Sequence, residues 1–493
     1  MKAVVLHGPG DLRVESVPDP VLPAGGLIVR PATVGVCGSD VRTWRYGNPR
    51  LHGPQVLGHE VGGVVVQTAV PGFDPGMPVA VCPGAPCLQC RFCQAGRQNL
   101  CIRRKVLGYD TPGGMAEAFA VPIEWVRAGC VVPLGPTLPV AYGAVAEPLH
   151  TVLNGQDQAR VRPGESVLVL GLGPIGVLHL AVARSRGASP VVGVDLNAGR
   201  VAAAADLFGE SHVIRLEPGW EDAARGRTNE SGGFDVVVIA TGARDAVAAA
   251  LTMAAPLGRI LAFAGMPADQ GSVEVDFNAV HYRQLTLVGA FGGTPPHFRR
   301  AVRWLSESPL DLARYTPIRY PLDAALEAFE SVARGDGLKT LLEVSCRTAV
   351  RIRMRRPEDL VLEVSGNLGI GQASGVQPLQ LGAVRAHDLD RAIGVAVTKR
   401  LVTALHERDL GVPGVIELVD EQAVIAQGSR SDDHRDQLFQ AGIAGGSEDL
   451  PVQLHREPGE RRPVVSASSA LELFDDLADF CELGGSDPGD DER

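Results

Sequence analysis

A glycine-rich turn between two regular segments limits the fold more than any other feature of the sequence. Gly171, Gly173 and Gly176 form a G-x-G-x-x-G pattern, preceded by the apolar run Val167–Leu170 and followed by a predicted helix, Ile175–Arg184. The first glycine allows the tight turn, the second lets a pyrophosphate approach the backbone, and the third lets the helix pack close to the strand. The pattern therefore predicts a dinucleotide site with the pyrophosphate at the N-terminus of the helix.

The residues around this turn favour the same interpretation. Pro174 and Ile175, where the predicted helix begins, are expected to contact the cofactor together with the glycines, and a second apolar segment, Pro190–Val194, leads into Asp195. A carboxylate about 20 residues beyond the glycines is the expected partner of a ribose 2′-hydroxyl, and it repels a 2′-phosphate. Asp195 therefore favours NAD over NADP. A glycine-rich loop in some other α/β fold is the alternative, and it does not account for the strand before and the helix and strand after.

Four cysteines lie within a stretch of 15 residues, at Cys87, Cys90, Cys93 and Cys101. A single cysteine is usually a small buried hydrophobic residue, but four thiolates at this spacing can complete the tetrahedral shell of a structural zinc. In a cytosolic chain such a cluster indicates a metal rather than disulfides. We predict a structural zinc here, and we expect the nearby Cys82 to be a strand residue.

Three further residues of metal-ligand types lie near glycines at the ends of apolar segments; one is far in the sequence from the other two, which are adjacent. They are Cys37, His59 and Glu60. Cysteine, histidine and carboxylate can together hold a catalytic zinc that keeps one position for substrate or water. Taken singly, they could equally be a core cysteine, a capped histidine and a surface glutamate.

Composition excludes some classes of function. The chain has 493 residues, which suggests two or three domains, and a net charge of −11, which argues against general nucleic-acid binding. No apolar run reaches the roughly 18 residues needed to span a membrane, and the run at Met1–Leu6 is too short for a signal peptide. We expect a cytoplasmic protein that binds neither nucleic acid nor membranes.

Residues 149–289 alternate apolar segments with alanine-rich helices, as parallel βαβ units do. Further helices are predicted at 199–208, 296–305 and 323–333, and a last strand at 339–344. The candidate strands of this region are 166–170, 191–194, 213–216, 234–239, 259–263 and 285–289.

Taken as a set, the motifs resemble the zinc-containing medium-chain dehydrogenase/reductase family over about residues 1–345. The resemblance implies an α/β fold: a GroES-like β-rich catalytic domain (1–148 and 290–345) into which a doubly wound Rossmann NAD-binding domain (149–289) is inserted. The motifs are GVCGSD at 35–40, GHE at 58–60, the four-cysteine loop, GGMAE at 113–117, AEPL at 146–149 and GLGPIG at 171–176.

The motif around Glu147 is similar to that of the polyol (sorbitol), threonine and sugar dehydrogenases, whereas simple alcohol dehydrogenases have a cysteine ligand there. In polyol dehydrogenases the counterparts of Cys37, His59 and Glu60 hold the catalytic zinc, and that of Glu147 reaches the metal directly or through water. Ser39 is expected to accept the proton of the alcohol. The resemblance thus implies one catalytic and one structural zinc.

The chain also departs from these relatives. Threonine dehydrogenases have a proton-relay histidine where this chain has Arg42, and a guanidinium does not lose its proton at ordinary pH. Sorbitol dehydrogenases have a tyrosine at the place of Thr43 and a substrate-facing Arg-Tyr pair at the place of Gly292 and Gly293. We therefore expect a secondary alcohol as substrate without naming sorbitol.

The resemblance also implies further cofactor contacts. The counterpart of Arg200 lies along the adenosine ribose, although a basic contact to a 2′-phosphate is the alternative. A homodimer or homotetramer is expected. The nicotinamide end would be lined by Ala264, Gly265, Met266, Ala290, Phe291 and Gly292.

Residues 346–493 have a different composition from the rest. They hold 16 Lys and Arg against 26 Asp and Glu, no Trp or Tyr, and a single lysine, Lys399. Patches such as Leu360–Val364 and Leu389–Leu405 could order, and the glycine pattern at 366–371 has no βαβ context. We expect a largely disordered acidic extension that catalysis does not need, either an appended region or an unselected reading frame.

The sequence therefore predicts a zinc-dependent oxidoreductase that transfers a hydride from a secondary alcohol to NAD and yields a ketone. Polyols, sugars, cyclitols and hydroxy amino acids are the candidate substrates. The alternative is a zinc-free quinone or enone reductase, or a non-catalytic nucleotide-binding protein on the same scaffold. That branch lacks the Cys37/His59 pair and the four-cysteine loop, so the sequence disfavours it.

Overall fold

The computed structural model describes residues 1–228, 232–266, 271–307 and 310–344 with their side chains, and beyond them five strands only. The chain divides into two compact units, Met1–Val344 and Ser345–Arg493. Apart from these strands, the predicted disordered extension 346–493 lies outside the described residues, and so do the Leu389–Leu405 patch and the glycine pattern at 366–371. Every candidate site residue named above lies in the first unit.

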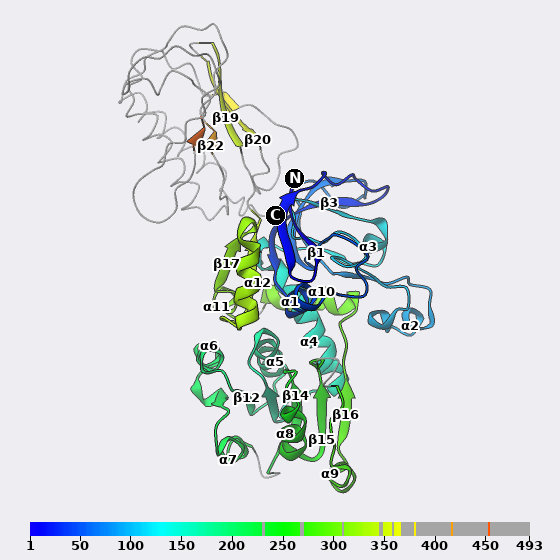
Figure 1. The fold of residues 1–493 in the computed structure, drawn as a ribbon, viewed down its shortest axis with the longest axis vertical. Helices are drawn as coiled ribbons and strands as arrows, with labels where there is room; N and C mark the ends of the chain where they lie inside the picture. The colour runs from blue at the N-terminus through cyan, green and yellow to red at the C-terminus, as the bar shows by residue number, and fades with distance from the viewer. Residues whose placement is uncertain are drawn as a thin grey trace, which may run out of the picture. The chain divides into compact units, whose positions relative to one another are not determined.

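The described strands of the second unit form two small sheets (Figure 1). β19 (Ala349–Arg356), β20 (Asp359–Ser365) and β21 (Leu379–Gln380) form an antiparallel sheet. β20 contains the patch Leu360–Val364. β22 (Ile416–Glu417) pairs in parallel with β23 (Val452–Gln453).

One seven-stranded sheet of the first unit joins residues from both ends of that unit. β18 (Thr340–Glu343) pairs antiparallel with β3 (Leu27–Gly35), so the end of the unit returns to the sheet that its beginning forms. A smaller sheet has the order β2-β1-β4 and a two-stranded one pairs β7 with β8. The other strands of the large sheet are β5 (Glu60–Thr68), β6 (Pro78–Val81), β9 (Phe119–Val121), β10 (Val131–Pro133) and β17 (Ile318–Pro321). The strands of the two smaller sheets are β1 (Lys2–Gly8), β2 (Asp11–Ser16), β4 (Gln55–Val56), β7 (Gly84–Ala85) and β8 (Lys105–Val106).

A second, six-stranded sheet is entirely parallel and has the order β13-β12-β11-β14-β15-β16. This is the doubly wound order. From β11 the chain adds strands first on one side of the sheet, as β12 and β13, and then on the other, as β14, β15 and β16. In such sheets a ligand crevice lies at the carboxyl ends of the strands where the order reverses. All six predicted strands are present. They are β11 (Val167–Leu170), β12 (Val191–Asp195), β13 (Val213–Arg215), β14 (Phe234–Ile239), β15 (Ala254–Ala262) and β16 (Thr286–Gly289).

The boundaries of β15 differ from the prediction. The sequence predicts a strand from Arg259, but β15 begins at Ala254, directly after the preceding helix. Ala254 pairs with Phe234, and the register then shifts before Val236 pairs with Arg259. The intervening Pro256 and Gly258 conceal the strand in the sequence, because both are residues that usually mark a turn.

The helices of the first unit connect and cover these sheets (Figure 1). Helix α4 contacts α5 and α10 as well as strands of both large sheets, so it joins the two halves of the unit. The helices are α1 (Gly38–Tyr46), α2 (Arg91–Gln94), α3 (Ile123–Arg127), α4 (Ala146–Ala159), α5 (Pro174–Ser185), α6 (Ala198–Phe208), α7 (Trp220–Arg225), α8 (Asp245–Met253), α9 (Phe277–Arg283), α10 (Pro295–Glu307), α11 (Leu312–Tyr315) and α12 (Ala325–Arg334).

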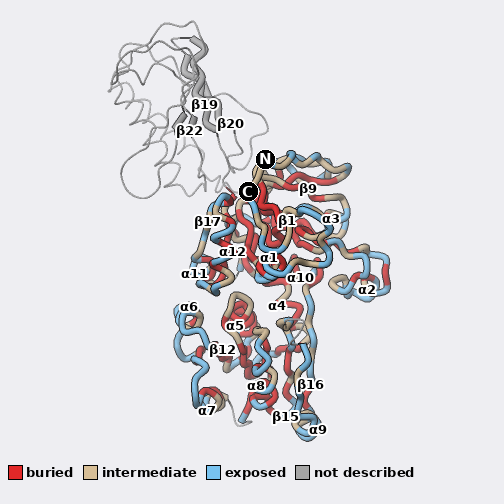
Figure 2. Tube along the Cα trace, in the orientation of Figure 1, coloured by how far each residue is buried: buried red, intermediate tan, exposed pale blue. Residues whose placement is uncertain are grey.

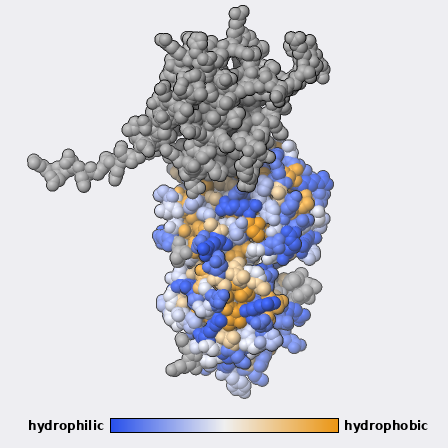
Figure 3. Space-filling model, turned by 90° about the vertical axis from the view of Figure 1, so that its left-hand side faces the viewer, coloured by the Kyte–Doolittle hydropathy of each residue, from blue (hydrophilic) through white to orange (hydrophobic). Residues whose placement is uncertain are grey.

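One buried apolar cluster includes residues of both halves of the unit, and Figure 2 shows buried segments in both halves. Val61 of β5 and Val169 of β11 belong to the same buried cluster, and Leu149, Val152 and Leu153 of α4 connect them. In Figure 3 hydrophilic and hydrophobic side chains are interspersed over one face of this unit. In the part of the chain described here, no helix is both long and apolar enough to cross a bilayer.

Candidate functional site

Two neighbouring strands bring Cys37, His59 and Glu60 together. Cys37 lies between β3 and the first turn of α1, and His59 directly precedes Glu60, the first residue of β5. Because Gly35 of β3 pairs with Glu60, the two strand ends meet. One ligand atom from each of the three residues lies within 4.8 Å of the others, and His59 and Glu60 are buried.

Asp40 holds His59 in place. The Asp40 carboxylate is 1 % exposed, its Oδ1 lies 3.1 Å from His59 Nδ1, and its Oδ2 accepts a hydrogen bond from the Cys37 N–H at 3.1 Å. The other ring nitrogen, Nε2, lies 3.4 Å from Ser39 Oγ. A carboxylate behind one ring nitrogen fixes the tautomer and leaves the other nitrogen free to bind a metal. Asp40 belongs to the GVCGSD motif, but we did not single it out from the sequence.

Glu60 has a partner that we did not find from the sequence. Lys339 precedes β18, is 4 % exposed, contacts Glu60 Oε2 with its Nζ, and donates to the Val36 carbonyl at 3.0 Å. Burial opposes the charged ammonium, but Glu60 and Cys37 outweigh it and raise the pKa of Lys339. The negative charge of Glu60 is therefore compensated inside the site.

Glu147 lies near Cys37, His59 and Glu60, but it is not one of the residues whose ligand atoms lie within 4.8 Å of one another. It is in the first turn of α4, and burial raises its pKa, with Glu60 adding to the rise and His150 and His59 opposing it. His150, one turn further on, contacts the Glu147 carbonyl with Nδ1 and packs edge-on against Phe298 at 5.5 Å between ring centroids. Glu147 is thus held close to the three-residue group by its own helix.

Tyr109 is a further residue of the site that the sequence did not indicate. Its ring centroid lies 5.9 Å from that of His59, and its hydroxyl lies near the side chains of Ser39 and Thr43. Burial raises the pKa of Tyr109. Arg50, which pairs with Asp110, places its guanidinium 6.0 Å from the Tyr109 ring centroid. Ser39 and Tyr109 therefore both lie beside His59.

The four cysteines form a separate group. The Sγ atoms of Cys87, Cys90, Cys93 and Cys101 lie within 4.8 Å of one another. The Cys87 N–H donates to the Cys101 Sγ at 3.3 Å, and backbone hydrogen bonds lower the pKa of Cys87 to about 6. Helix α2 and the β7–β8 pair hold the loop, which projects from the body of the unit (Figure 1).

Cys82 is not one of this group and is not in a strand as predicted. It lies one residue beyond β6, although its N–H donates to the Cys130 carbonyl at 2.7 Å. The side chain is 1 % exposed, so Cys82 belongs to the core.

The glycine-rich turn has the geometry that a dinucleotide needs. Gly171 has φ +100°, and a Cβ on Gly176 would lie 1.8 Å from the Gly171 carbonyl oxygen, so both positions require glycine. Asp195 Oδ2 accepts a hydrogen bond from the Leu172 N–H at 2.7 Å, and its Oδ1 accepts one from the Asn197 N–H at 2.7 Å. Each oxygen keeps a second acceptor position for a ribose hydroxyl.

Arg200 lies beside this turn. Its Nη1 is 4.0 Å from Asp195 Oδ2 and 3.8 Å from the place of a Cβ on Gly173. Its Nε is buried and has no hydrogen-bond partner within the described ranges. This orphaned donor at the edge of the turn is the kind of group that a bound dinucleotide would satisfy.

The two segments predicted to line the nicotinamide follow adjacent strands. β15 and β16 pair in parallel as far as Ala262 and Gly289, and the Ala290 N–H donates to the Ala262 carbonyl at 3.4 Å. Residues 264–266 and 290–292 therefore emerge at the same carboxyl edge. The Phe291 carbonyl accepts from Asn99 and the Gly292 carbonyl from Asn154, each at 2.8 Å.

The donor sets fit the groups that the sequence implies. Three mutually close N, O and S donors suit a catalytic zinc, four thiol sulfurs suit a structural zinc, and the glycine turn with Asp195 suits a dinucleotide. None of the three sites needs a rearranged backbone to bring its residues together.

Comparisons with known proteins give the family. Residues 23–132 match the model of the alcohol dehydrogenase GroES-like domain, and residues 174–307 match that of the zinc-binding dehydrogenases. The chain is 32% identical to sorbitol dehydrogenase of Macaca fascicularis over 351 residues, which are 69% of this chain and 95% of that protein. It is 32% identical to a probable D-xylulose reductase A of Aspergillus clavatus over 69% of this chain and 95% of the relative.

Solved structures agree with this placement. Alcohol dehydrogenase TADH from Thermus sp. ATN1 superposes with a TM-score of 0.62 and 29% identity, covering 70% of this chain and 100% of that one. A putative zinc-binding dehydrogenase of Sinorhizobium meliloti, bound to NADP, gives a TM-score of 0.63 and 29% identity over 70% and 99%.

The chain belongs to the zinc-containing medium-chain dehydrogenase/reductase family. It is an oxidoreductase of the kind that acts on CH–OH groups with zinc and a nicotinamide dinucleotide as cofactors. The predicted GroES-like and Rossmann folds are confirmed.

Proposed function

We propose that this chain oxidises a secondary alcohol of the polyol class to a ketone and transfers the hydride to NAD. Polyols, sugars, cyclitols and hydroxy amino acids are the candidate substrates. One observation carries the proposal: Cys37, His59 and Glu60 converge in one group beside the Ser39 hydroxyl. The relatives named sorbitol dehydrogenase and D-xylulose reductase support the polyol class.

Cys37, His59 and Glu60 would hold the catalytic zinc, with Glu147 at or near a fourth position. When bound, zinc supplies Lewis-acid catalysis that lowers the pKa of the substrate hydroxyl, and NAD supplies the hydride acceptor. Asp40 orients His59, and Lys339 compensates the charge of Glu60.

Ser39 would take the proton of the alcohol, since its Oγ lies 3.4 Å from His59 Nε2 and so borders the metal ligands. The Tyr109 hydroxyl lies near both Ser39 and Thr43, and a tyrosine hydroxyl can accept a hydrogen bond from a serine. Arg42 is exposed, and an arginine side chain does not serve as a proton relay, so it does not take part.

A substrate panel tests the proposal. Polyols, sugars, aminocyclitols and 3-hydroxy amino acids are offered with NAD, and NADH absorbance is followed, while metal analysis counts zinc. We expect about two zinc ions per chain and turnover of at least one secondary alcohol. A zinc-free protein that reduces quinones or enones, or that binds NAD without turnover, would favour the alternative on the same scaffold.

Cofactor preference gives a separate prediction. Replacing Asp195 with alanine should raise the ratio of kcat/KM with NADP to kcat/KM with NAD by about 10- to 100-fold, because it removes a charged ribose acceptor and a repulsion of the 2′-phosphate. Asp195→Asn, which can keep one of the two backbone contacts, separates this effect from loosening of the glycine turn. Comparable kcat/KM values for NAD and NADP in the wild-type enzyme would contradict the assignment.

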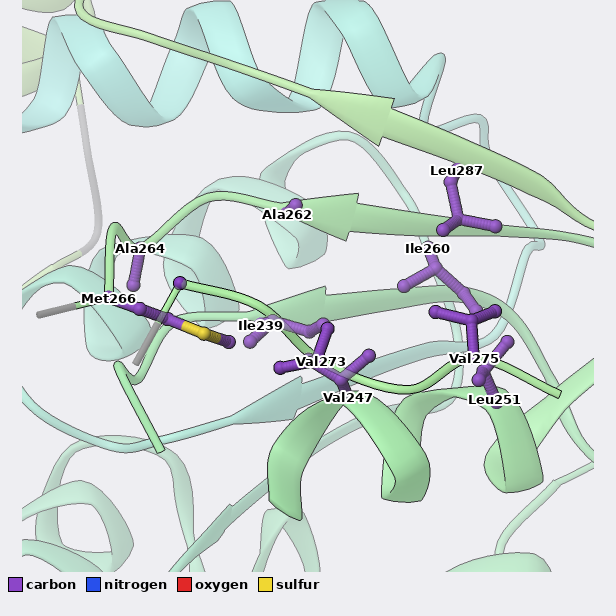
Figure 4. Close-up of a pocket in the computed structure, with 11 residues that line it drawn as sticks. Ile239, Val247, Leu251, Ile260, Ala262, Ala264, Met266, Val273, Val275 and Leu287 are labelled. Carbon is purple, nitrogen blue, oxygen red and sulfur yellow. The ribbon is translucent and has the colours of Figure 1, made fainter. Parts of the chain in front are cut away.

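We also propose that the chain forms a homodimer or homotetramer through the β16 edge. β16 is the last strand of its sheet among the described strands, and Leu287 on it is 51 % exposed. Beside it lies an apolar pocket of about 370 Å³ between β15 and α8, and Figure 4 shows apolar side chains pointing into it. An unpaired apolar edge strand favours pairing with another chain.

Light scattering of the purified protein tests this proposal. Wild type should have the mass of two or four chains, and Leu287→Lys should shift it toward one. Leu216→Lys is the matched control, since Leu216 is 40 % exposed but follows β13 at the opposite edge of the sheet. A wild-type monomer, or equal dissociation by both variants, would count against the β16 edge.

A further inference from the structure

Arg104 reaches from the cysteine loop to the segment that follows β16. It lies three residues after Cys101 and just before β8. Its guanidinium carbon is 5.3 Å from the Phe291 ring centroid, and its Nη1 is 3.4 Å from the place of a Cβ on Gly292. The Arg104 side chain therefore borders the predicted nicotinamide end, and Glu147 is near enough to act on its charge.

Two glycines make room for this arrangement. Gly292 has φ +56°, a conformation that favours glycine, and any side chain there would meet the Arg104 guanidinium. A Cβ on Gly293 would lie 2.3 Å from Cδ2 of His150. The segment after β16 thus has the small residues Gly292 and Gly293, and the guanidinium of Arg104, from the cysteine loop, lies beside Gly292.

The guanidinium of Arg104 has no ion pair or hydrogen bond to any residue whose side chain the structure describes. Burial and the nearby Arg50 lower the pKa of Arg104. Arg50 is in a different position, because Asp110 pairs with it. Glu147 does not pair with Arg104, and its charge is also shared with His150, His59 and Lys339.

A partly desolvated cation without a counter-ion lowers the stability of the folded protein. A functional role would explain why such a residue is present. A guanidinium presents a planar fork of donors that matches carboxylate and phosphate oxygens. Contact with the ring of Phe291, which is 62 % exposed, is a weak interaction at such a site. The ring contact alone does not explain why an arginine lies here.

We propose that Arg104 binds an anionic group, a carboxylate or a phosphate, carried by the alcohol substrate. The inference rests on the proposed function, because it places the oxidised carbon at the Cys37, His59 and Glu60 group. Arg104 is a specificity-determining residue in this proposal. It makes acidic or phosphorylated sugar alcohols better substrates than the neutral polyols.

Kinetics with three matched compounds test the proposal: sorbitol, gluconate and sorbitol 6-phosphate, each with NAD and the full-length zinc-loaded enzyme. Arg104→Met keeps apolar contact with Phe291 but removes the charge, and Arg104→Lys keeps the charge without the fork. Arg97→Met is the control, since Arg97 is exposed in the same loop and its side chain makes no hydrogen bond or ion pair with any described residue.

We expect wild type to prefer one anionic compound, and that compound identifies carboxylate or phosphate as the group bound. Arg104→Met should lower kcat/KM for it by about 10- to 100-fold, mainly through KM, and change sorbitol kinetics by less than about threefold. Arg104→Lys should fall between, and Arg97→Met should match wild type. An equal loss with all three compounds would overturn the proposal and make Arg104 a structural contact of Phe291.

Calorimetry of the NADH-loaded protein separates this proposal from the proposed function. If no alcohol of the panel is oxidised, the proposed function fails, and binding still decides the role of Arg104. At least tenfold tighter binding of gluconate or sorbitol 6-phosphate by wild type than by Arg104→Met supports an anion site. Equal affinity, or no binding of either compound to wild type, overturns it.

Discussion

Replacing Cys37 with alanine is expected to lower kcat/KM for the alcohol by about 1,000-fold or more. Lewis-acid stabilisation of the transition state by a catalytic zinc is worth several kcal/mol, and about 1.4 kcal/mol corresponds to a factor of ten in rate. Cys37 contributes one of the three donors that lie within 4.8 Å of one another, and its loss leaves too few protein ligands for a tight site. Zinc content should fall by about one ion per chain.

The control for this variant is Cys130→Ala. Cys130 is fully buried and belongs to neither metal-ligand group, so its replacement removes buried packing and a hydrogen bond to the Gly84 carbonyl, but no metal ligand. Both zinc ions and most of the activity should remain. A Cys37→Ala enzyme with full metal content and full activity would show that the assignment of the catalytic site is wrong.

Replacing Cys93 with serine is expected to remove the structural zinc and to lower the Tm by about 10 °C. Loss of a structural metal is among the few single changes that cost more than about 4 kcal/mol, and each kcal/mol moves the Tm of a domain this large by about 2–4 °C. Burial raises the pKa of Cys93 to about 12, so zinc binding must displace its proton.

In this variant, activity should be lost because the protein becomes less stable, and not because the catalytic chemistry is impaired. Asn99, which lies in the cysteine loop, donates to the Phe291 carbonyl at 2.8 Å, so a disordered loop would also loosen the nicotinamide end. Assays well below the lowered Tm should therefore retain part of kcat, in contrast with Cys37→Ala. Chelator-treated protein that has lost this zinc and still melts at the wild-type temperature would refute a structural role.

Local patterns predicted the fold well where a short stretch carries the whole signal. The six strands of the parallel sheet were found because each is a compact apolar run, and only the start of β15 was misplaced, where Pro256 and Gly258 imitate a turn. The two metal-ligand groups were also anticipated, and the structure brings each of them together. Their roles in binding and catalysis stay predictions until the variants are measured.

Contacts between distant segments were not predicted. Lys339 reads as the first residue of an ordinary strand, yet it lies against Glu60, 279 positions earlier in the chain. Tyr109 and His150 carry no motif, and they become part of the site only because their loop and helix pack beside His59 and Glu147. Such neighbours depend on how the strands and helices are arranged, which no local spacing records.

The sequence by itself determined the parts whose chemistry is local: the glycine turn, where the sterics of Gly171 and Gly176 act within six residues, and the cysteine loop, where ligand spacing limits the metal. The tertiary structure decided which charges meet. It paired Lys339 with Glu60 and left Arg104 without a partner in the described part of the chain, beside the glycines that follow β16. Electrostatic energy depends on distance in space rather than along the chain, and for that reason these pairings needed the folded structure.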